Sequence, residues 1–327
     1  MITHVERGPG EERDCGRIWA LSDGRAGNAR QAEALAAALS ARSDAQHLDP
    51  RVPWRWAAPR RLPFASHAFG SDYAARLAAP PDIAIGCGRQ AALATRLAGQ
   101  RGARTVQILD PRIDPRHWNL VVVPEHDALR GENVLVARGS LHPVDDAWLA
   151  AARAAHPTLG ALPGPRIAVL LGGDSRHGRF DVAAFGALAD RLDAIVAREG
   201  GSLLLTGSRR TSPAVRDALR TRYAGRAASI WADARDGANP YAGMLGWADR
   251  IICSSDSVNM LSEACATRAP VFVFAPGPLE GAPQRFVDGL LTDGRARVFE
   301  NALPAFDVTP LRETARIADE VRARMGL

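Results

Sequence analysis

The residues best suited to bind an anion form the run SSDSVNMLSE at positions 254–263. Apolar residues before this run predict a strand over Arg250–Cys253, and the spacing after it predicts a helix over Val258–Thr267. Backbone N–H groups at a helix start carry a partial positive charge, so such a start can bind a pyrophosphate. Small residues also let a phosphate approach the backbone. The predicted ligands are Ser254, Ser255, Asp256, Ser257 and Asn259.

Glu263 lies about two turns into the same predicted helix. A carboxylate at that place can accept hydrogen bonds from the hydroxyls of a ribose whose diphosphate is held at the helix start. A plainer interpretation stays open, in which Ser255 or Ser257 is only a helix N-cap and Glu263 is only a solvated helix residue.

Two other loops follow predicted strands in the same half of the chain. The first, after Ile167–Leu171, reads GGDSRH, and the second, after Ser202–Thr206, reads GSRRT. Glycines permit close approach of a ligand, and guanidinium groups bind phosphates. Neither loop matches GxGxxG or a P-loop, so a generic glycine-rich turn and ordinary surface arginines remain alternatives. The predicted ligands here are Gly172, Gly173, Ser175, Arg176, Ser208, Arg209 and Arg210.

The three loops are expected to lie close together. Each follows a strand in a pattern of alternating strands and helices, which is typical of a parallel sheet. The carboxyl ends of parallel strands meet at one edge of the sheet, where open α/β proteins bind ligands. We therefore predict one shared diphosphate site.

In the first half of the chain, three ionisable residues end a predicted strand over Leu120–Pro124. Glu125, His126 or Asp127 can serve as a general base toward a hydroxyl, or can hydrogen-bond to a ligand. A structural role in fixing the loop is equally open. Cys87 lies between two glycines, but no partner base is evident, and a buried thiol is the better interpretation. No metal-ligand spacing appears, so we expect no metal.

The strand and helix pattern predicts two domains. Strands and helices alternate from Arg17 to Ala137, apart from an irregular stretch at 49–81 that is rich in Pro, Trp and Arg. The proline-rich segment at 156–165 predicts a linker. The expected division is a Rossmann-like domain at 15–155, the linker at 156–165, a Rossmann-like nucleotide-binding domain at 166–309, and a helix at 310–327 that packs back on the first domain.

Composition limits the classes of partner. The 327 residues carry a formal net charge of +5, and all 41 basic residues are arginine. The arginines form no run of five or more and no stripe interleaved with aromatic residues, so we expect no nucleic-acid partner. The charged start is not a signal peptide, and no apolar run is long enough to span a bilayer. We expect a cytoplasmic protein, at most peripheral to the inner membrane.

Several phrases resemble the mitochondrial fission ELM family. They are LSDGRAGNARQAEALA, IGCGRQAA, QILDPRI, LVVVPEHD, LLGGDSRHGRF, TGSRRTS and NPYAGMLGWADRIICSSDSVNMLSEACATRAPVFVF. The composition suggests a bacterial member. The resemblance implies an α/β, GT-B-like fold, with two Rossmann-type domains whose parallel sheets face a central cleft. It places the nucleotide in the second domain and the acceptor on the side of the first.

The same resemblance implies three functions, which stay open here. The first is a glycosyltransferase that uses a nucleotide-diphosphate sugar as substrate, without a separate cofactor, and a carbohydrate or membrane-associated acceptor. The second is a nucleoside-diphosphate-sugar epimerase or hydrolase. The third is a binding or adaptor protein that catalyses nothing. The sequence does not specify the base, the sugar or the oligomeric state.

Overall fold

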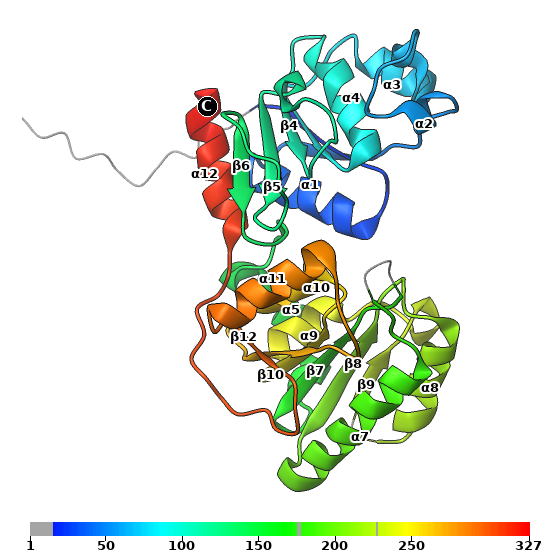
Figure 1. Ribbon diagram of the computed structural model, residues 1–327, viewed down its shortest axis with the longest axis vertical. Helices are drawn as coiled ribbons and strands as arrows, with labels where there is room; N and C mark the ends of the chain where they lie inside the picture. The colour runs from blue at the N-terminus through cyan, green and yellow to red at the C-terminus, as the bar shows by residue number, and fades with distance from the viewer. Residues whose placement is uncertain (1–15, 175–177, 227) are drawn as a thin grey trace, which may run out of the picture. The chain divides into compact units, whose positions relative to one another are not determined.

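The computed structural model describes residues 16–174, 178–226 and 228–327, which form two compact units (Figure 1). Unit 1 contains the described residues up to Val123, together with Leu129–Ala137 and Thr314–Leu327. Unit 2 contains Pro124–Ala128 and Arg138–Glu313. Each unit has its own six-stranded sheet, so each unit is an α/β domain in its own right.

The sheet of unit 1 has the strand order β2-β1-β3-β4-β5-β6. Strand β1 pairs in parallel with both β2 and β3, and β4 pairs in parallel with β3 and β5. The strands are β1 (Ile18–Ser22), β2 (Ser43–His47), β3 (Ile83–Cys87), β4 (Arg104–Ile108), β5 (Leu120–Pro124) and β6 (Val134–Ala137). The helices are α1 (Ala26–Leu39), α2 (Trp54–Ala57), η1 (Ala65–His67), α3 (Gly70–Arg76), α4 (Arg89–Gly99), η2 (Pro115–His117) and α12 (Glu313–Met325).

The sheet of unit 2 has the strand order β12-β11-β10-β7-β8-β9, and all five neighbouring pairs are parallel. The strands are β7 (Arg166–Leu171), β8 (Ser202–Gly207), β9 (Ala228–Trp231), β10 (Arg250–Ser254), β11 (Val271–Phe274) and β12 (Ala296–Val298). The helices are α5 (Asp146–Ala155), α6 (Pro157–Gly160), α7 (Val182–Glu199), α8 (Pro213–Tyr223), η3 (Ala234–Asp236), α9 (Tyr241–Trp247), α10 (Val258–Cys265) and α11 (Gly281–Thr292). The predicted α/β class with two parallel sheets is confirmed.

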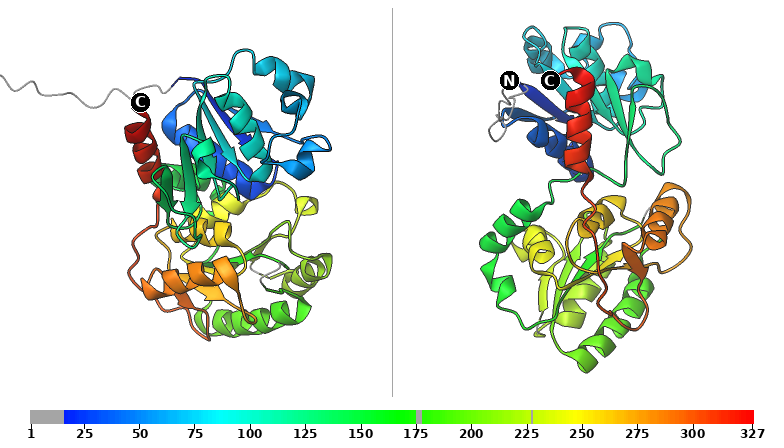
Figure 2. Two further views of the ribbon diagram at one scale, coloured as in Figure 1. Left: turned by 45° about the horizontal axis from the view of Figure 1, so that its top comes forward. Right: turned by 90° about the vertical axis from the view of Figure 1, so that its left-hand side faces the viewer.

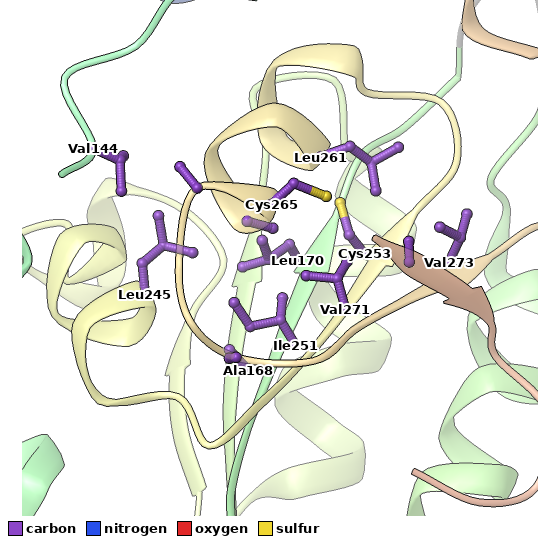
Figure 3. Close-up of a cluster of buried hydrophobic side chains, with 14 of the residues drawn as sticks. Val144, Ala168, Leu170, Leu245, Ile251, Cys253, Leu261, Cys265, Val271 and Val273 are labelled. Atoms are coloured by element: carbon purple, nitrogen blue, oxygen red, sulfur yellow. The ribbon is translucent and has the colours of Figure 1, made fainter. Parts of the chain in front are cut away.

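Helices cover both faces of the sheet of unit 2. Side chains alternate between faces along a strand, so Ala168 and Leu170 belong to one buried cluster, whereas Ile167 and Val169 belong to another. The first cluster packs against α5, α9, α10 and α11, and part of it is drawn in Figure 3. The second packs against α7 and α8. Burial on both faces explains why these strands read as continuous apolar runs.

Two elements differ from the sequence-based expectation. Strand β2 (SDAQH) was not predicted, because it lies at the edge of its sheet and alternates between exposed and half-buried residues. Its polar composition gives no apolar run from which a strand could be predicted. The stretch at 49–81, for which no elements were predicted, contains α2, η1 and α3.

The boundary between the two units does not lie in the segment that the sequence predicted as a linker. The boundary lies between Ala137 and Arg138, and the residues at 156–165 belong to unit 2. These residues belong to unit 2 because the helices on either side of His156, α5 and α6, pack against α9. The indole N–H of Trp247, the last residue of α9, donates to the His156 carbonyl at 2.9 Å. Residues from Thr314 onward belong to unit 1, where Arg316 Nη2 donates to the Val136 carbonyl at 2.7 Å (Figure 2).

No helix in the described parts of the chain is long and apolar enough to cross a membrane.

Candidate functional site

Three strand-end loops meet at one edge of the sheet of unit 2. Strands β10, β7 and β8 are neighbours in the sheet, so the loops after them are neighbours too. The Gly172 N–H donates to Ser254 Oγ at 2.8 Å, and the Gly173 N–H donates to Asp256 Oδ2 at 3.0 Å. Ser208 Oγ donates to the Gly172 carbonyl at 3.0 Å. Among the described residues, the structure therefore brings together the three loops that the sequence predicted as one group.

Gly172 and Gly173 are required because other groups lie against their Cα atoms. A Cβ on Gly172 would collide with the carboxylate of Asp256, and a Cβ on Gly173 would collide with the backbone of Arg210 and Thr211. Neither glycine has a positive φ. Close packing of the loops, rather than an unusual backbone conformation, excludes a side chain here.

Arg210 is an internal partner within this cluster. Its Nη2 donates to Asp256 Oδ2 at 2.6 Å, and its Nη1 donates to the Gly173 carbonyl at 3.1 Å. The Asp256 side chain is only 7% exposed, whereas that of Arg210 is 39% exposed, so the carboxylate is buried and the guanidinium is partly in contact with water. Arg210 and Asp256 therefore tie the loop after β8 to the loops after β7 and β10.

Arg209 differs from its neighbour. It is exposed, and within the described part of the chain its guanidinium makes no hydrogen bond or ion pair. Only its backbone carbonyl is engaged, as the acceptor of a 3.2 Å hydrogen bond from Arg216 Nη2. Of the two predicted arginines in the loop after β8, Arg209 is the one whose guanidinium has no partner among the described residues.

The start of α10 leaves backbone donors available. Ser257 occupies the N-cap position, but its side chain makes no capping hydrogen bond. The first N–H of the helix to find a backbone acceptor is that of Leu261, which donates to the Ser257 carbonyl at 3.0 Å. The N–H groups of Val258, Asn259 and Met260 have no acceptor among the described residues. Three such donors at a helix start are suited to bind an anion.

A small pocket opens beside this helix start. It is lined by Ser255 and Asp256, by Gly178 and Arg179, and by the segment Pro276–Leu279 between β11 and α11. The guanidinium of Arg179 therefore lines the same pocket as the predicted serine loop.

Glu263 is buried rather than solvated. It is 3% exposed, and the hydroxyl of Tyr241, the first residue of α9, donates to its carboxylate. Burial lowers the pKa of the nearby His142, and the charge of Glu263 opposes that shift. Six residues separate Glu263 from Ser257, which is about 9 Å along a helix axis. A buried carboxylate at this distance from an anion site fits a role in holding a polar group of a ligand.

The acidic segment after β5 packs against α11. Arg285 donates to the His126 carbonyl through Nη2 at 2.7 Å and through Nε at 3.0 Å. The His126 ring lies 5.6 Å from the ring of Phe286, and no hydrogen-bond partner of its Nδ1 lies in the described part of the chain. Burial lowers the pKa of His126, which Asp127 and Glu125 partly offset, so the imidazole is neutral at pH 7. A neutral imidazole can accept a proton.

Other predicted residues fall into two groups. Ser175 and Arg176 lie outside the described residues. Cys87 is a fully buried free thiol whose pKa is raised by burial and by the charge of Asp23. Cys253 and Cys265 are also buried, and their sulfur atoms face each other in Figure 3. Burial raises the pKa of Cys265 to about 11, so none of these three thiols is poised as a nucleophile.

The sequence did not single out two residues of this region. Thr211 Oγ1 accepts from the Ser208 N–H at 2.8 Å and donates to the Leu171 carbonyl at 3.1 Å, so it closes the loop after β8. Tyr241 holds Glu263. The only signal for Tyr241 was its place after Asn239-Pro240, which indicates a helix start but no partner. Within the described residues, no group of three or more His, Cys, Asp or Glu side chains is arranged to hold a metal.

Solved structures define the class of protein to which this fold belongs. A structure described as the glycotransferase of kitacinnamycin covers 94% of this chain and 98% of its own, with a TM-score of 0.52 and 16% identity. A UDP-N-acetylglucosamine 2-epimerase from Rickettsia bellii covers 94% and 95%, with a TM-score of 0.50 and 10% identity. At such low identity the similarity shows the fold alone. The chain has the GT-B-type fold of glycosyltransferases and nucleotide-sugar epimerases.

The chain belongs to the Mitochondrial fission ELM1 family, which it matches over residues 26–325. It is 28% identical over 276 residues to mitochondrial fission protein ELM1 of Arabidopsis thaliana, a match that takes in 75% of this chain and 64% of that protein. It is 22% identical over 352 aligned positions to the uncharacterized protein RP120 of Rickettsia prowazekii strain Madrid E, covering 93% and 97%. The chain thus spans less than two thirds of the plant relative, and the family resemblance of the sequence is confirmed.

Proposed function

We propose that this protein binds a nucleotide-diphosphate sugar at the carboxyl edge of the sheet of unit 2 and transfers the sugar to an acceptor. The observation that carries the proposal is the start of α10, where three N–H groups that have no acceptor among the described residues lie beside loops that are hydrogen-bonded to one another. The dipole of the helix and these donors favour a diphosphate.

Each part of the donor substrate has a proposed partner. The diphosphate binds the N–H groups of Val258 and Asn259 and the guanidinium of Arg209. Arg209 supplies the positive charge for the ligand, because the charge of Arg210 is paired with Asp256. The ribose binds the carboxylate of Glu263, which then shares its oxygens between the ribose hydroxyls and Tyr241. Arg210 and Asp256 shape the site without touching the ligand.

The chemical step requires a base and a stabilised leaving group. The acceptor oxygen attacks the anomeric carbon, and the bond between that carbon and the diphosphate oxygen breaks. The nucleoside diphosphate leaves with the electron pair, and the donors at α10 and Arg209 stabilise its charge. The acceptor proton passes to the segment Glu125–Asp127, where the neutral imidazole of His126 is suited to take it.

A second candidate is supported by the epimerases among the similar structures, which include the S. aureus MnaA–UDP co-structure at a TM-score of 0.50 and 12% identity. An epimerase or hydrolase would use the same diphosphate and ribose contacts but needs no acceptor.

A third candidate, a protein that binds and does not catalyse, is supported by the name of the Arabidopsis relative, which refers to mitochondrial fission.

The binding step is tested by thermal shift with a panel of nucleoside diphosphates and nucleotide sugars. A ligand at about 100 times its Kd stabilises the folded state by roughly 2.7 kcal/mol. Arg209→Gln is expected to weaken the best ligand about tenfold, because a charge-assisted hydrogen bond contributes about 1.5–3 kcal/mol. Arg226→Gln is the matched control. Arg226 is also exposed, lies between the end of α8 and the start of β9, and forms an ion pair with Asp193 of α7.

If no nucleotide raises the melting temperature, or if Arg209→Gln binds as tightly as the unsubstituted protein, the diphosphate site is wrongly placed. Loss of binding in Arg226→Gln as well would indicate an effect of net charge alone.

The reaction class is tested by analysing the products of the bound nucleotide sugar. A transferase releases nucleoside diphosphate only when an acceptor is added. A hydrolase releases it in water, and an epimerase returns a nucleotide sugar of altered configuration. We expect release that depends on the acceptor and that falls at least about a hundredfold in His126→Gln, the usual contribution of a general base. Turnover without acceptor would replace the transferase by the second candidate, and no turnover with any acceptor would favour the third.

A further inference from the structure

A second polar pocket lies in unit 1, at the edge of the sheet opposite to the carboxyl ends of its strands. It has a volume of about 420 Å³, within the range of small-molecule sites. It lies between the last turn of α4, the first residues of β4 and the residues just before β5. Arg61, from the stretch at 49–81 for which the sequence predicted no role, forms another part of its wall.

The lining carries an excess of positive charge. Arg61, Arg96, Arg116 and His117 all line the pocket, and no lining residue is acidic. Arg61 and Arg96 form no ion pair with a carboxylate in the described part of the chain. Asp114 lies 3.4 Å from Arg116 Nε, but that arginine side chain is 87% exposed, so the pair is weak.

The arginines are close enough to repel one another. Burial lowers the pKa of Arg96, and the charge of Arg61 lowers it further. Burial also lowers the pKa of His117, and the charges of Arg96 and Arg61 act in the same direction, against Asp114. A bound anion would relieve this repulsion, because it would interact favourably with every one of these groups.

Neutral donors complete the wall. The carbonyl oxygen of Asn119 accepts from the Thr105 N–H at 2.8 Å and from Thr105 Oγ1 at 3.1 Å, so the group that Asn119 offers a ligand is its amide NH₂. With its carbonyl oxygen turned toward Arg61, Gln100 accepts from Arg61 Nη2 at 3.0 Å, which orients that guanidinium. Arg96 Nη1 donates to the Pro59 carbonyl at 2.6 Å, and its guanidinium lies 5.9 Å from the ring of Trp118. Arg96 is thus held in place, and Gln100 holds Arg61 when its amide has this orientation.

We infer that this pocket is a binding site for a phosphate monoester. Several guanidinium groups with an amide donor match the three terminal oxygens and double charge of such a group, and a guanidinium group can bind two phosphate oxygens at once. The site is separate from the proposed diphosphate site, since it belongs to unit 1 and lies at the amino ends of strands. It does not depend on the proposed function. The monoester is either a soluble metabolite or the head group of a lipid.

The test follows the imidazole signal of His117 by NMR, assigned with His117→Gln, while sn-glycerol 3-phosphate is added at constant ionic strength. A local signal separates this pocket from the site in unit 2. We expect saturable changes in the chemical shift of this signal, and an affinity for glycerol phosphate that is about tenfold weaker in Arg61→Gln and in Arg116→Gln. These two side chains are exposed and hold no backbone carbonyl of another segment. Arg101→Gln is the control, because Arg101 is exposed and nearby but does not line the pocket.

A second arm distinguishes the sources of the phosphate. Vesicles of phosphatidylcholine with phosphatidic acid present the same monoester on a membrane, and vesicles of phosphatidylcholine alone do not. Co-sedimentation only with phosphatidic acid, reduced in Arg61→Gln and not in Arg101→Gln, would support the site with a lipid as its ligand. The inference is overturned if neither glycerol phosphate nor these vesicles bind, or if Arg61→Gln and Arg116→Gln bind as Arg101→Gln does.

Discussion

Gly173→Ala is expected to destabilise unit 2 and to abolish nucleotide binding together. A Cβ at this position would lie inside the contact distance of the Arg210 backbone, and backbone atoms cannot rotate away as a side chain can. Overpacking of this kind costs about 1–3 kcal/mol or more, and here it would push the loop after β8 away from the loops after β7 and β10. The measurement is urea unfolding, followed by the thermal-shift panel on the folded fraction.

Gly172→Ala provides a comparison, because its Cβ would meet the carboxylate of Asp256 rather than backbone. We expect Gly172→Ala to lower the free energy of unfolding less in an Asp256→Ala background than in the unsubstituted protein. The loss of stability caused by Gly173→Ala should be the same in both backgrounds. Gly186→Ala, in the middle of α7 with open space around the new Cβ, should raise stability by about 0.5–1 kcal/mol. Equal, small effects for Gly173→Ala and Gly186→Ala would show that the loops do not pack as described.

Glu263→Gln is expected to remove the preference for a ribose. In the unsubstituted protein a nucleoside diphosphate should bind about tenfold or more tightly than its 2′-deoxy analogue, because the carboxylate accepts a charge-assisted hydrogen bond from the 2′-hydroxyl. Glutamine keeps the volume and an acceptor for Tyr241 but loses the charge. The two ligands should then bind with similar, weak affinity, as measured by calorimetry.

Tyr241→Phe separates the structural role of Glu263 from its role in binding. Removing the hydroxyl should cost about 1 kcal/mol of stability while keeping the charged carboxylate that accepts from the ribose. Binding of the ribonucleotide should therefore persist. If Glu263→Gln keeps the discrimination between ribose and deoxyribose, Glu263 serves only the buried contact with Tyr241, and the ribose position is wrong.

Much of unit 2 was predictable because its strands are apolar and its loops are short. The runs at Ile167–Leu171 and Ser202–Thr206 and the cap at Ser212-Pro213 are local signals, and the structure has β7, β8 and α8 at these places. Strand β2 was not predictable from the same signals, since an edge strand that is exposed on alternate residues needs no apolar run.

The boundary between the units could not be predicted from local sequence signals either. A proline-rich segment predicts an interruption in regular structure, not a change of domain. Residues at 156–165 stay in unit 2 because α5 and α6 pack against α9, a contact between segments about ninety positions apart in the chain, as in the hydrogen bond from Trp247 to His156.

The sequence by itself determined that three polar loops follow parallel strands and therefore share an edge, because strand polarity and sheet topology leave them no other place. Only the tertiary structure decided what each side chain does there. Arg209 and Arg210 are adjacent and chemically identical, yet Arg210 is bound to Asp256, 46 positions away, and Arg209 is exposed. Such partners depend on distances between segments that are far apart in sequence, and no local pattern of residue types encodes them.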